Sequence, residues 1–98
     1  MPVDDIATFT CSIIEATADL VCAFKPNSAF FEAEGFDGMR ALGQTITAAK
    51  AVGVPVILDA KRGDIGSTAQ AYAKAIFEAW DVDATTVNAW GGHDSIEP

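Results

Sequence analysis

The sequence predicts an α/β fold in which a parallel sheet is covered by helices. Three apolar runs, within residues 20–24, 54–61 and 83–92, have the length of strands, and each gives way to polar residues. Apolar residues recur at helical spacing before and between these runs. Apolar strands that alternate with amphipathic helices are typical of parallel sheets. We therefore expect the order α, β, α, β, α, β in a single segment, residues 1–98.

Each predicted helix has one apolar face. The second runs through residues 36–53 and ends at a glycine. In the third, Ser67 and Gln70 have the spacing of a capping box. A further helix is expected to begin at Asp94 or Ser95. The residues expected to face the core are Ile6, Phe9, Ile13 and Ala16 in the first helix, Met39, Leu42, Ile46 and Ala49 in the second, and Tyr72, Ala73, Ile76, Phe77 and Trp80 in the third.

The composition argues against several classes of protein. The net charge is -8, and nucleic-acid binding needs clustered Lys and Arg. No apolar run approaches the ~20 residues that cross a bilayer. Asp4 and Asp5 stand where a signal peptide would be basic, and Cys11 and Cys22 are expected to be free, buried thiols. We expect a cytoplasmic protein that binds neither nucleic acid nor membranes.

Charged residues gather at the predicted strand ends. Asp59 and Lys61 are two apart on a strand, so they project from the same face. Lys25 ends the preceding strand and Asn88 the following one, and parallel α/β folds carry their chemistry at these carboxyl ends. Two ammonium groups around one carboxylate would keep Asp59 ionised and Lys61 charged. The pattern predicts a Lys-Asp-Lys site.

The charged residues also have simpler interpretations. Ordinary solvation would explain an isolated Asp-x-Lys at a strand end, but the matching Lys25 and the extra acid Asp64 favour a site. Asp64 follows the strand in a loop, where it would face the same cavity or a neighbouring subunit. Arg62 is expected to form a surface salt bridge. His93, the only histidine, is expected to have no nearby Cys or carboxylate pair and so to be a poor metal site.

Three longer segments carry a resemblance to a known family. "VCAFKPNSAFFEAEG", "LDAKRGDIGSTAQAYAKAIF" and "TVNAWGGHDSIEP" resemble orotidine 5'-phosphate decarboxylases, in the branch whose catalytic strand reads D-A-K-R-G-D-I. The resemblance extends from about Asp19 to Pro98, with matching order and spacing. It implies decarboxylation of orotidine 5'-phosphate to uridine 5'-phosphate in pyrimidine biosynthesis, without a cofactor or a metal.

The resemblance also implies a role for each matching residue. Lys61 matches the lysine that protonates C6 of the pyrimidine, and Asp59 matches the carboxylate beside the departing carboxylate of the substrate. Lys25 matches the lysine that hydrogen-bonds this network and the ribose. Asp64 matches an acid contributed to the other subunit's site in a homodimer.

Further matches concern the substrate and the size of the fold. Ile65 and Thr68 match residues that reach the substrate from the same side of the dimer interface, and Asn88 is expected to bind the substrate as well. The family fold is a (β/α)8 TIM barrel of about 250 residues. This chain would supply about three consecutive βα units of that barrel, and we expect it to have negligible activity alone.

Two other functions stay open at this point. Relatives of the same barrel superfamily that act on sugar phosphates share D-x-K-x-x-D but use a divalent metal to stabilise an enediolate. The R-G-D-I loop and the K-P-N strand end favour the nucleotide decarboxylase. The second alternative is a non-catalytic fragment that serves as an assembly module. Trp80 and Trp90 are expected to be packing residues in any of these cases.

Overall fold

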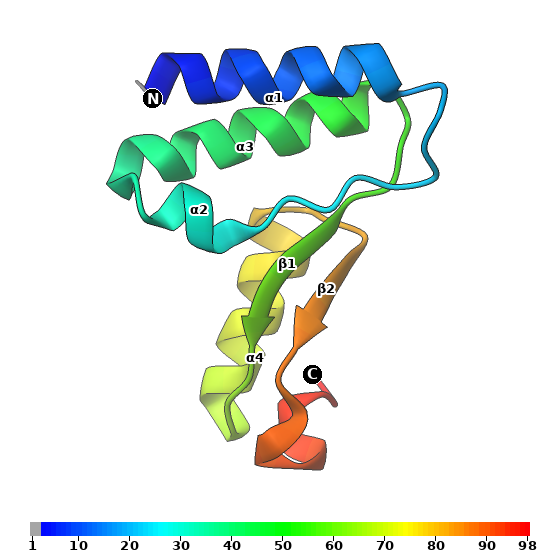
Figure 1. Ribbon diagram of the computed structural model, residues 1–98. Helices are drawn as coiled ribbons and strands as arrows, with labels where there is room; N and C mark the ends of the chain where they lie inside the picture. Colours follow the sequence, from blue (N-terminus) through cyan, green and yellow to red (C-terminus); the bar gives the residue numbers. More distant parts are fainter. Residues whose placement is uncertain (1–2) are drawn as a thin grey trace.

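The computed structural model describes residues 3–98 and has the predicted α/β class, as part of a parallel barrel (Figure 1). Helices α1 and α3 lie side by side, and β1 and β2 run next to α4 (Figure 1). The elements are α1 (Val3–Thr17), α2 (Ser28–Glu32), α3 (Gly35–Ala51), β1 (Ile57–Arg62), α4 (Gly66–Lys74) with a π-helical continuation (Ala75–Ala79), β2 (Ala84–Val87), and 3-10 turns at Ala89–Gly91 and His93–Ser95.

The sheet pairs β1 with β2 in parallel, and a third segment joins the other edge of β1. That segment makes isolated bridges at Phe24 and Asn27 instead of a continuous strand. Pro26 lies between the bridges and has no N–H to donate, although its carbonyl accepts from Asp59. The strand predicted at residues 20–24 is therefore wrong in extent, and the extended pairing lies further along the chain.

The core forms where α1 and α3 pack on the sheet. Leu42 of α3 and Val56, just before β1, are completely buried. The predicted apolar face of α3 is confirmed, because Leu42, Ile46 and Ala49 are buried and Met39 packs against them. In α1 the predicted face is confirmed only at Ile6, which packs against the core, because Phe9, Ile13 and Ala16 are exposed.

Helix α1 instead turns a neighbouring face to α3. Ile14 is buried there. The hydroxyl groups of Thr10 and Thr45 lie 2.7 Å apart and link the two helices. Because the polar Thr10 lies on this buried face, the spacing of apolar residues alone did not predict which face of α1 packs against α3.

The third helix differs from its prediction at its start and along its inward face. It begins at Gly66 with Ile65 as its N-cap, and no side chain caps it, so Ser67 and Gln70 form no capping box. Ile76 is buried, but Tyr72 and Phe77 are partly exposed. These two side chains line a cavity between α4 and β2.

Several smaller predictions also need correction. Cys11 and Cys22 are free, but Cys22 is exposed. Trp80 packs against the core, whereas Trp90 is 95% exposed. The helix predicted at Asp94 or Ser95 is a single 3-10 turn preceded by Gly92. Across the described part of the chain, no helix has the length and apolar character needed to span a bilayer.

Candidate active site

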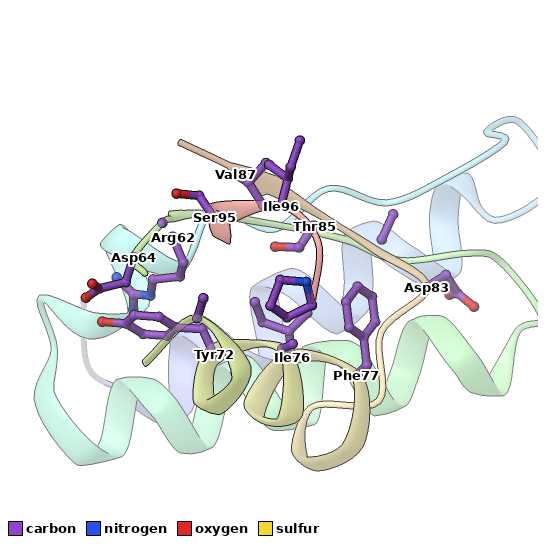
Figure 2. Close-up of a pocket in the computed structure, with 15 residues that line it drawn as sticks. Arg62, Asp64, Tyr72, Ile76, Phe77, Asp83, Thr85, Val87, Ser95 and Ile96 are labelled. Atoms are coloured by element: carbon purple, nitrogen blue, oxygen red, sulfur yellow. The ribbon is translucent and has the colours of Figure 1, made fainter. Parts of the chain in front are cut away.

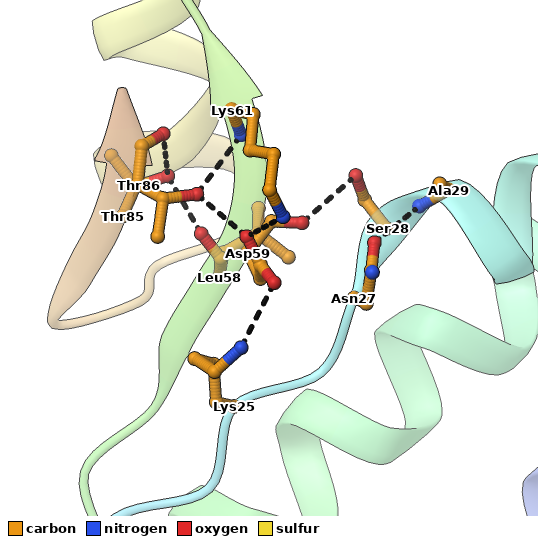
Figure 3. Close-up of polar contacts among 9 residues, drawn as sticks. All are labelled: Lys25, Asn27, Ser28, Ala29, Leu58, Asp59, Lys61, Thr85 and Thr86. Carbon is orange, nitrogen blue, oxygen red and sulfur yellow. Dashed lines mark hydrogen bonds and ion pairs between the residues drawn. The ribbon is translucent and has the colours of Figure 1, made fainter. Parts of the chain in front are cut away.

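Asp59 is the centre of a polar network on β1 (Figure 3). Lys25 Nζ lies 2.9 Å from its Oδ2, and Lys61 Nζ lies 2.5 Å from its Oδ1. Thr86 Oγ1 donates a hydrogen bond of 2.8 Å to the same Oδ1. The Asp59 side chain is 7% exposed, while those of Lys25 and Lys61 are 55% and 66% exposed. A buried carboxylate thus lies beneath two ammonium groups that remain open to a ligand.

The fold brings these charges together because neighbouring strands run in parallel. Lys25 lies between the two bridges that join its segment to β1. Asp59 and Lys61 are two residues apart on β1, and Lys61 Nζ reaches Asp59 Oδ1. The predicted Lys-Asp-Lys cluster is confirmed in its geometry. The chain that follows Lys25 is held by Asn27, whose Oδ1 accepts from the N–H of Ala29 and caps α2.

The backbone at Lys61 is strained. Its φ is 51°, a left-handed conformation that costs a residue other than glycine about 1 kcal/mol or more. The register between β1 and β2 shifts between Leu58 and Arg62, so β1 is irregular where it carries Asp59 and Lys61. The N–H of Lys61 donates to Thr86 Oγ1 at 3.0 Å. A side chain of β2 therefore supports the irregular turn of β1.

The network holds the pKa of Asp59 well below its ordinary value. The main cause is the hydrogen bond from Lys61, followed by those from Lys25 and Thr86, and together they outweigh the opposing effect of burial. The carboxylate is therefore ionised at any pH at which the protein would work. A fixed negative charge lies next to two fixed positive charges, and such an array can stabilise charge that develops on a bound ligand.

The remaining predicted site residues lie outside this network. Asp64 is in the loop after β1, where its Oδ1 accepts from the N–H of Ile65 at 2.8 Å. Ile65 is 61% exposed, and Thr68 is exposed in the first turn of α4. Asn88 follows β2, and its Oδ1 accepts from the N–H of Trp90. No hydrogen bond recorded for the described residues connects these four to Asp59.

Arg62 behaves as predicted, because it forms a salt bridge with Glu32. Its guanidinium also lies over the ring of Tyr72, 5.6 Å from the centroid. The next residue, Gly63, passes so close to Asn88 that a Cβ would lie 2.3 Å from the Asn88 carbonyl oxygen. A larger residue than glycine would therefore push the loop that carries Asp64 away from β2.

Two contacts of Asp59 were missed by the sequence analysis. Thr86 binds its carboxylate, and the buried Ser28 hydroxyl lies 3.5 Å from its backbone oxygen. Thr86 lies in the quoted family segment, but nothing in its spacing marks it as a partner of Asp59. Only the register of β2 against β1 reveals the contact.

The cavity lined by Tyr72 and Phe77 is a hollow between α4, β2 and the carboxyl-terminal turn (Figure 2). Its volume is about 340 Å³, and Tyr72, Ile76 and Phe77 line one side. The Ser95 hydroxyl is buried without a hydrogen-bond partner among the residues that the structure describes. None of Lys25, Asp59 and Lys61 lines this hollow, so it is separate from the charged network.

His93 has closer carboxylates than the sequence suggested. Its Nδ1 lies 3.4 Å from Glu97 Oε2. Ligand atoms of His93, Asp94 and Glu97 lie within 4.8 Å of one another, but all three side chains are exposed. The prediction that His93 lacks a carboxylate pair is wrong, because the terminal 3-10 turn folds the two acids around it.

The fold and the charged network together define a segment of a parallel α/β barrel with a polar site near the ends of its strands. Such ends carry the active sites of barrel enzymes. The sequence profile of the orotidine 5'-phosphate decarboxylase / HUMPS family matches residues 5–98. The chain belongs to this family.

Individual relatives agree with the family match. Orotidine 5'-phosphate decarboxylase of Roseiflexus sp. (strain RS-1) is 57% identical over 95 residues, which cover 97% of this chain and 34% of that protein. The enzyme of the same name from Dechloromonas aromatica is 53% identical over 96 residues, 97% of this chain and 35% of that protein. The chain therefore spans about a third of the length of the curated relatives it matches.

Solved structures show the same arrangement of the backbone. Leishmania donovani OMP decarboxylase superposes with a TM-score of 0.94 at 42% identity, covering 100% of this chain and 39% of that one. Leishmania donovani UMP synthase gives 0.93 at 43% identity, covering 98% of this chain and 21% of that one.

Replacing either lysine should raise the pKa of Asp59 toward the ~3.9 of an unperturbed aspartate. Lys61→Ala should raise it more than Lys25→Ala, because Lys61 is the larger cause of the lowering. Since the folded-state pKa lies below the unfolded one, the network stabilises the fold above pH ~3.9 and this stabilisation is lost as the pH falls through the folded-state pKa. Carbon-13 NMR of the Asp59 carboxyl measures the titration.

The matched control is Lys50→Ala, which removes an ion pair with Asp81 away from β1. It should leave the titration of Asp59 unchanged. An unaltered chain whose Asp59 titrates near pH 3.9 would contradict the network described above.

Proposed function

We propose that residues 1–98 form one continuous barrel segment of an orotidine 5'-phosphate decarboxylase. The substrate would be orotidine 5'-phosphate, and the products uridine 5'-phosphate, as in pyrimidine biosynthesis, and carbon dioxide. The observation that carries the proposal is the contact of Asp59 with both Lys61 and Lys25, at 2.5 and 2.9 Å, in a chain of this family. The chain spans about a third of its relatives, so the rest of the site would come from other barrel segments.

Lys61 is the proposed proton donor. When the bond between C6 and the carboxylate breaks, its electron pair stays on C6 and carbon dioxide departs. The Lys61 ammonium gives a proton to C6, and the neutral amine then regains one from solvent. Because an ammonium beside the developing carbanion interacts with it more strongly than with the neutral ring carbon, it lowers the barrier to reaction.

Asp59 and Lys25 fix the position of that ammonium. Asp59 accepts from Lys61 at 2.5 Å and from Lys25 at 2.9 Å. Its negative charge would repel the departing carboxylate of the substrate, and this repulsion would be relieved when carbon dioxide leaves. Lys25, which is 55% exposed, has ammonium hydrogens left to donate to the ribose. No cofactor is required by this scheme.

A homodimer with shared sites is the proposed assembly. Asp64, Ile65 and Thr68 are exposed on one loop and the first turn of α4, away from the Asp59 network. This placement would allow them to reach the substrate in the partner's site. Asn88, at the end of β2, is the further substrate contact that we propose. We also propose a cytoplasmic location.

Lys61→Ala should abolish turnover while the fold is kept. The experiment uses a chimaera in which residues 5–98 replace the matching third of the Roseiflexus enzyme. Loss of a general acid is expected to lower kcat by at least about a hundredfold. Decarboxylation is followed by the ultraviolet absorbance of orotidine 5'-phosphate, and folding by circular dichroism.

Two controls accompany this variant. Lys50→Ala removes another exposed lysine and should leave kcat unchanged, since its partner is Asp81. Treatment with EDTA should have no effect. Activity that is lost with EDTA and returns with Mg²⁺ would favour a metal-dependent sugar-phosphate enzyme instead. Retained turnover in Lys61→Ala would remove that residue from its proposed role.

Mixing two inactive variants tests the shared site. Lys61→Ala and Asp64→Asn chimaeras should each be inactive, but their heterodimer holds one site with both native residues. Random reassociation would restore about a quarter of the parent's sites, as follows from twofold symmetry. The measurement is kcat after unfolding and refolding the mixture. No recovery in a mixture proven to contain heterodimers would mean that Asp64 serves its own subunit.

A further inference from the structure

We propose that Thr86 is a positioning residue for the decarboxylation, which holds Lys61 and Asp59 in their reactive geometry through one hydroxyl group. This inference rests on the proposed function. Thr86 lies on β2, next to the irregular part of β1, and its side chain is partly buried. It contacts both residues of the pair that would carry the chemistry (Figure 3).

The direction of both hydrogen bonds follows from the donors present. The backbone N–H of Lys61 can only donate, so Thr86 Oγ1 is the acceptor at 3.0 Å. A hydroxyl has a single hydrogen, and Asp59 Oδ1 lies 2.8 Å away to accept it. The Thr86 hydroxyl therefore accepts a hydrogen bond from the backbone of Lys61 and donates one to the side chain of Asp59.

The hydrogen bond between the Lys61 N–H and the Thr86 hydroxyl stabilises an irregular part of β1. Lys61 has a φ of 51°, and the strand register shifts between Leu58 and Arg62. A regular parallel ladder would pair this N–H with a carbonyl of β2, but the hydroxyl of Thr86 takes that place. The hydroxyl thus supports the backbone conformation from which the Lys61 side chain reaches Asp59.

The bond to Asp59 restricts the carboxylate. Its Oδ1 accepts from Thr86 and from Lys61 Nζ, while its Oδ2 accepts from Lys25. Without the hydroxyl, Oδ1 would keep only a flexible lysine as its partner. The carboxylate could then rotate and carry the Lys61 ammonium away from C6. Because the hydroxyl acts through these two groups, its loss should affect kcat more than KM.

The chain offers a matched control in the neighbouring threonine. Thr85 donates from its Oγ1 to the backbone oxygen of Leu58 at 2.8 Å. It lies on the same strand and is partly buried, as Thr86 is, but it makes no hydrogen bond with Asp59 or Lys61. A general effect of removing a hydroxyl from β2 should therefore appear in Thr85→Val as well.

The experiment compares Thr86→Val, Thr86→Ser and Thr85→Val in the chimaera with the Roseiflexus enzyme. Valine keeps the shape without the hydroxyl, and serine keeps the hydroxyl. Loss of a hydrogen bond to a charged group predicts a fall in kcat of about tenfold or more for Thr86→Val. KM should change little. Thr86→Ser should recover most of the loss, and Thr85→Val should resemble the parent.

The pH dependence gives a second readout that a purely structural role would not move. A donor to the ionised carboxylate lowers its pKa, so Thr86→Val should shift the titration of Asp59 to higher pH. Carbon-13 NMR of the Asp59 carboxyl measures the shift directly, and it does not depend on turnover.

The results separate the two proposals. If the parent chimaera is inactive, the proposed function fails, and the NMR titration still decides whether Thr86 holds Asp59. If the chimaera is active but Thr86→Val leaves both kcat and the Asp59 titration unchanged, the role of Thr86 is overturned and the function stands. Equal losses of activity in Thr85→Val and Thr86→Val, with no shift of the titration, would also overturn it.

Discussion

The contact of one buried carboxylate with two lysines is the interaction on which the site depends. Asp59 is 7% exposed, and an isolated charge at such a position would be costly. Lys61, Lys25 and Thr86 offset that cost, and they keep the pKa of the carboxyl below its ordinary range. In return, the carboxylate orders two lysines whose side chains would otherwise move freely in solvent. A charge array is therefore fixed before any substrate binds.

The surrounding fold is arranged so that this contact can form. The core of α1, α3 and the sheet fixes β1, and the parallel bridges at Phe24 and Asn27 hold Lys25 alongside it. The irregularity of β1 then turns Lys61 back toward Asp59, at the expense of a left-handed backbone. Strain of this kind persists only where neighbouring groups support it, and Thr86 supplies such support from β2.

The sequence predicted the α/β class, the face of α3 and the Lys-Asp-Lys cluster, because each depends on local spacing and on the common direction of parallel strands. It could not predict which face of α1 packs against α3, because that face carries the contact between Thr10 and Thr45. The bridges that replace a strand near Pro26 were also missed, since they depend on pairing across the sheet. Thr86 was missed for the same reason, because its contact follows from a shift in register and not from any motif.

The most direct test of the central claim is a crystal structure of the chimaera with 6-azauridine 5'-monophosphate bound. If the charge array is the reactive centre, Lys61 Nζ should lie within hydrogen-bonding reach, roughly 2.6–3.2 Å, of the ring position that corresponds to C6. Asp59 should lie beside the place of the departing carboxylate. A nucleotide whose ring lies in the hollow beside Tyr72, or anywhere else out of contact with Lys61, would contradict the account.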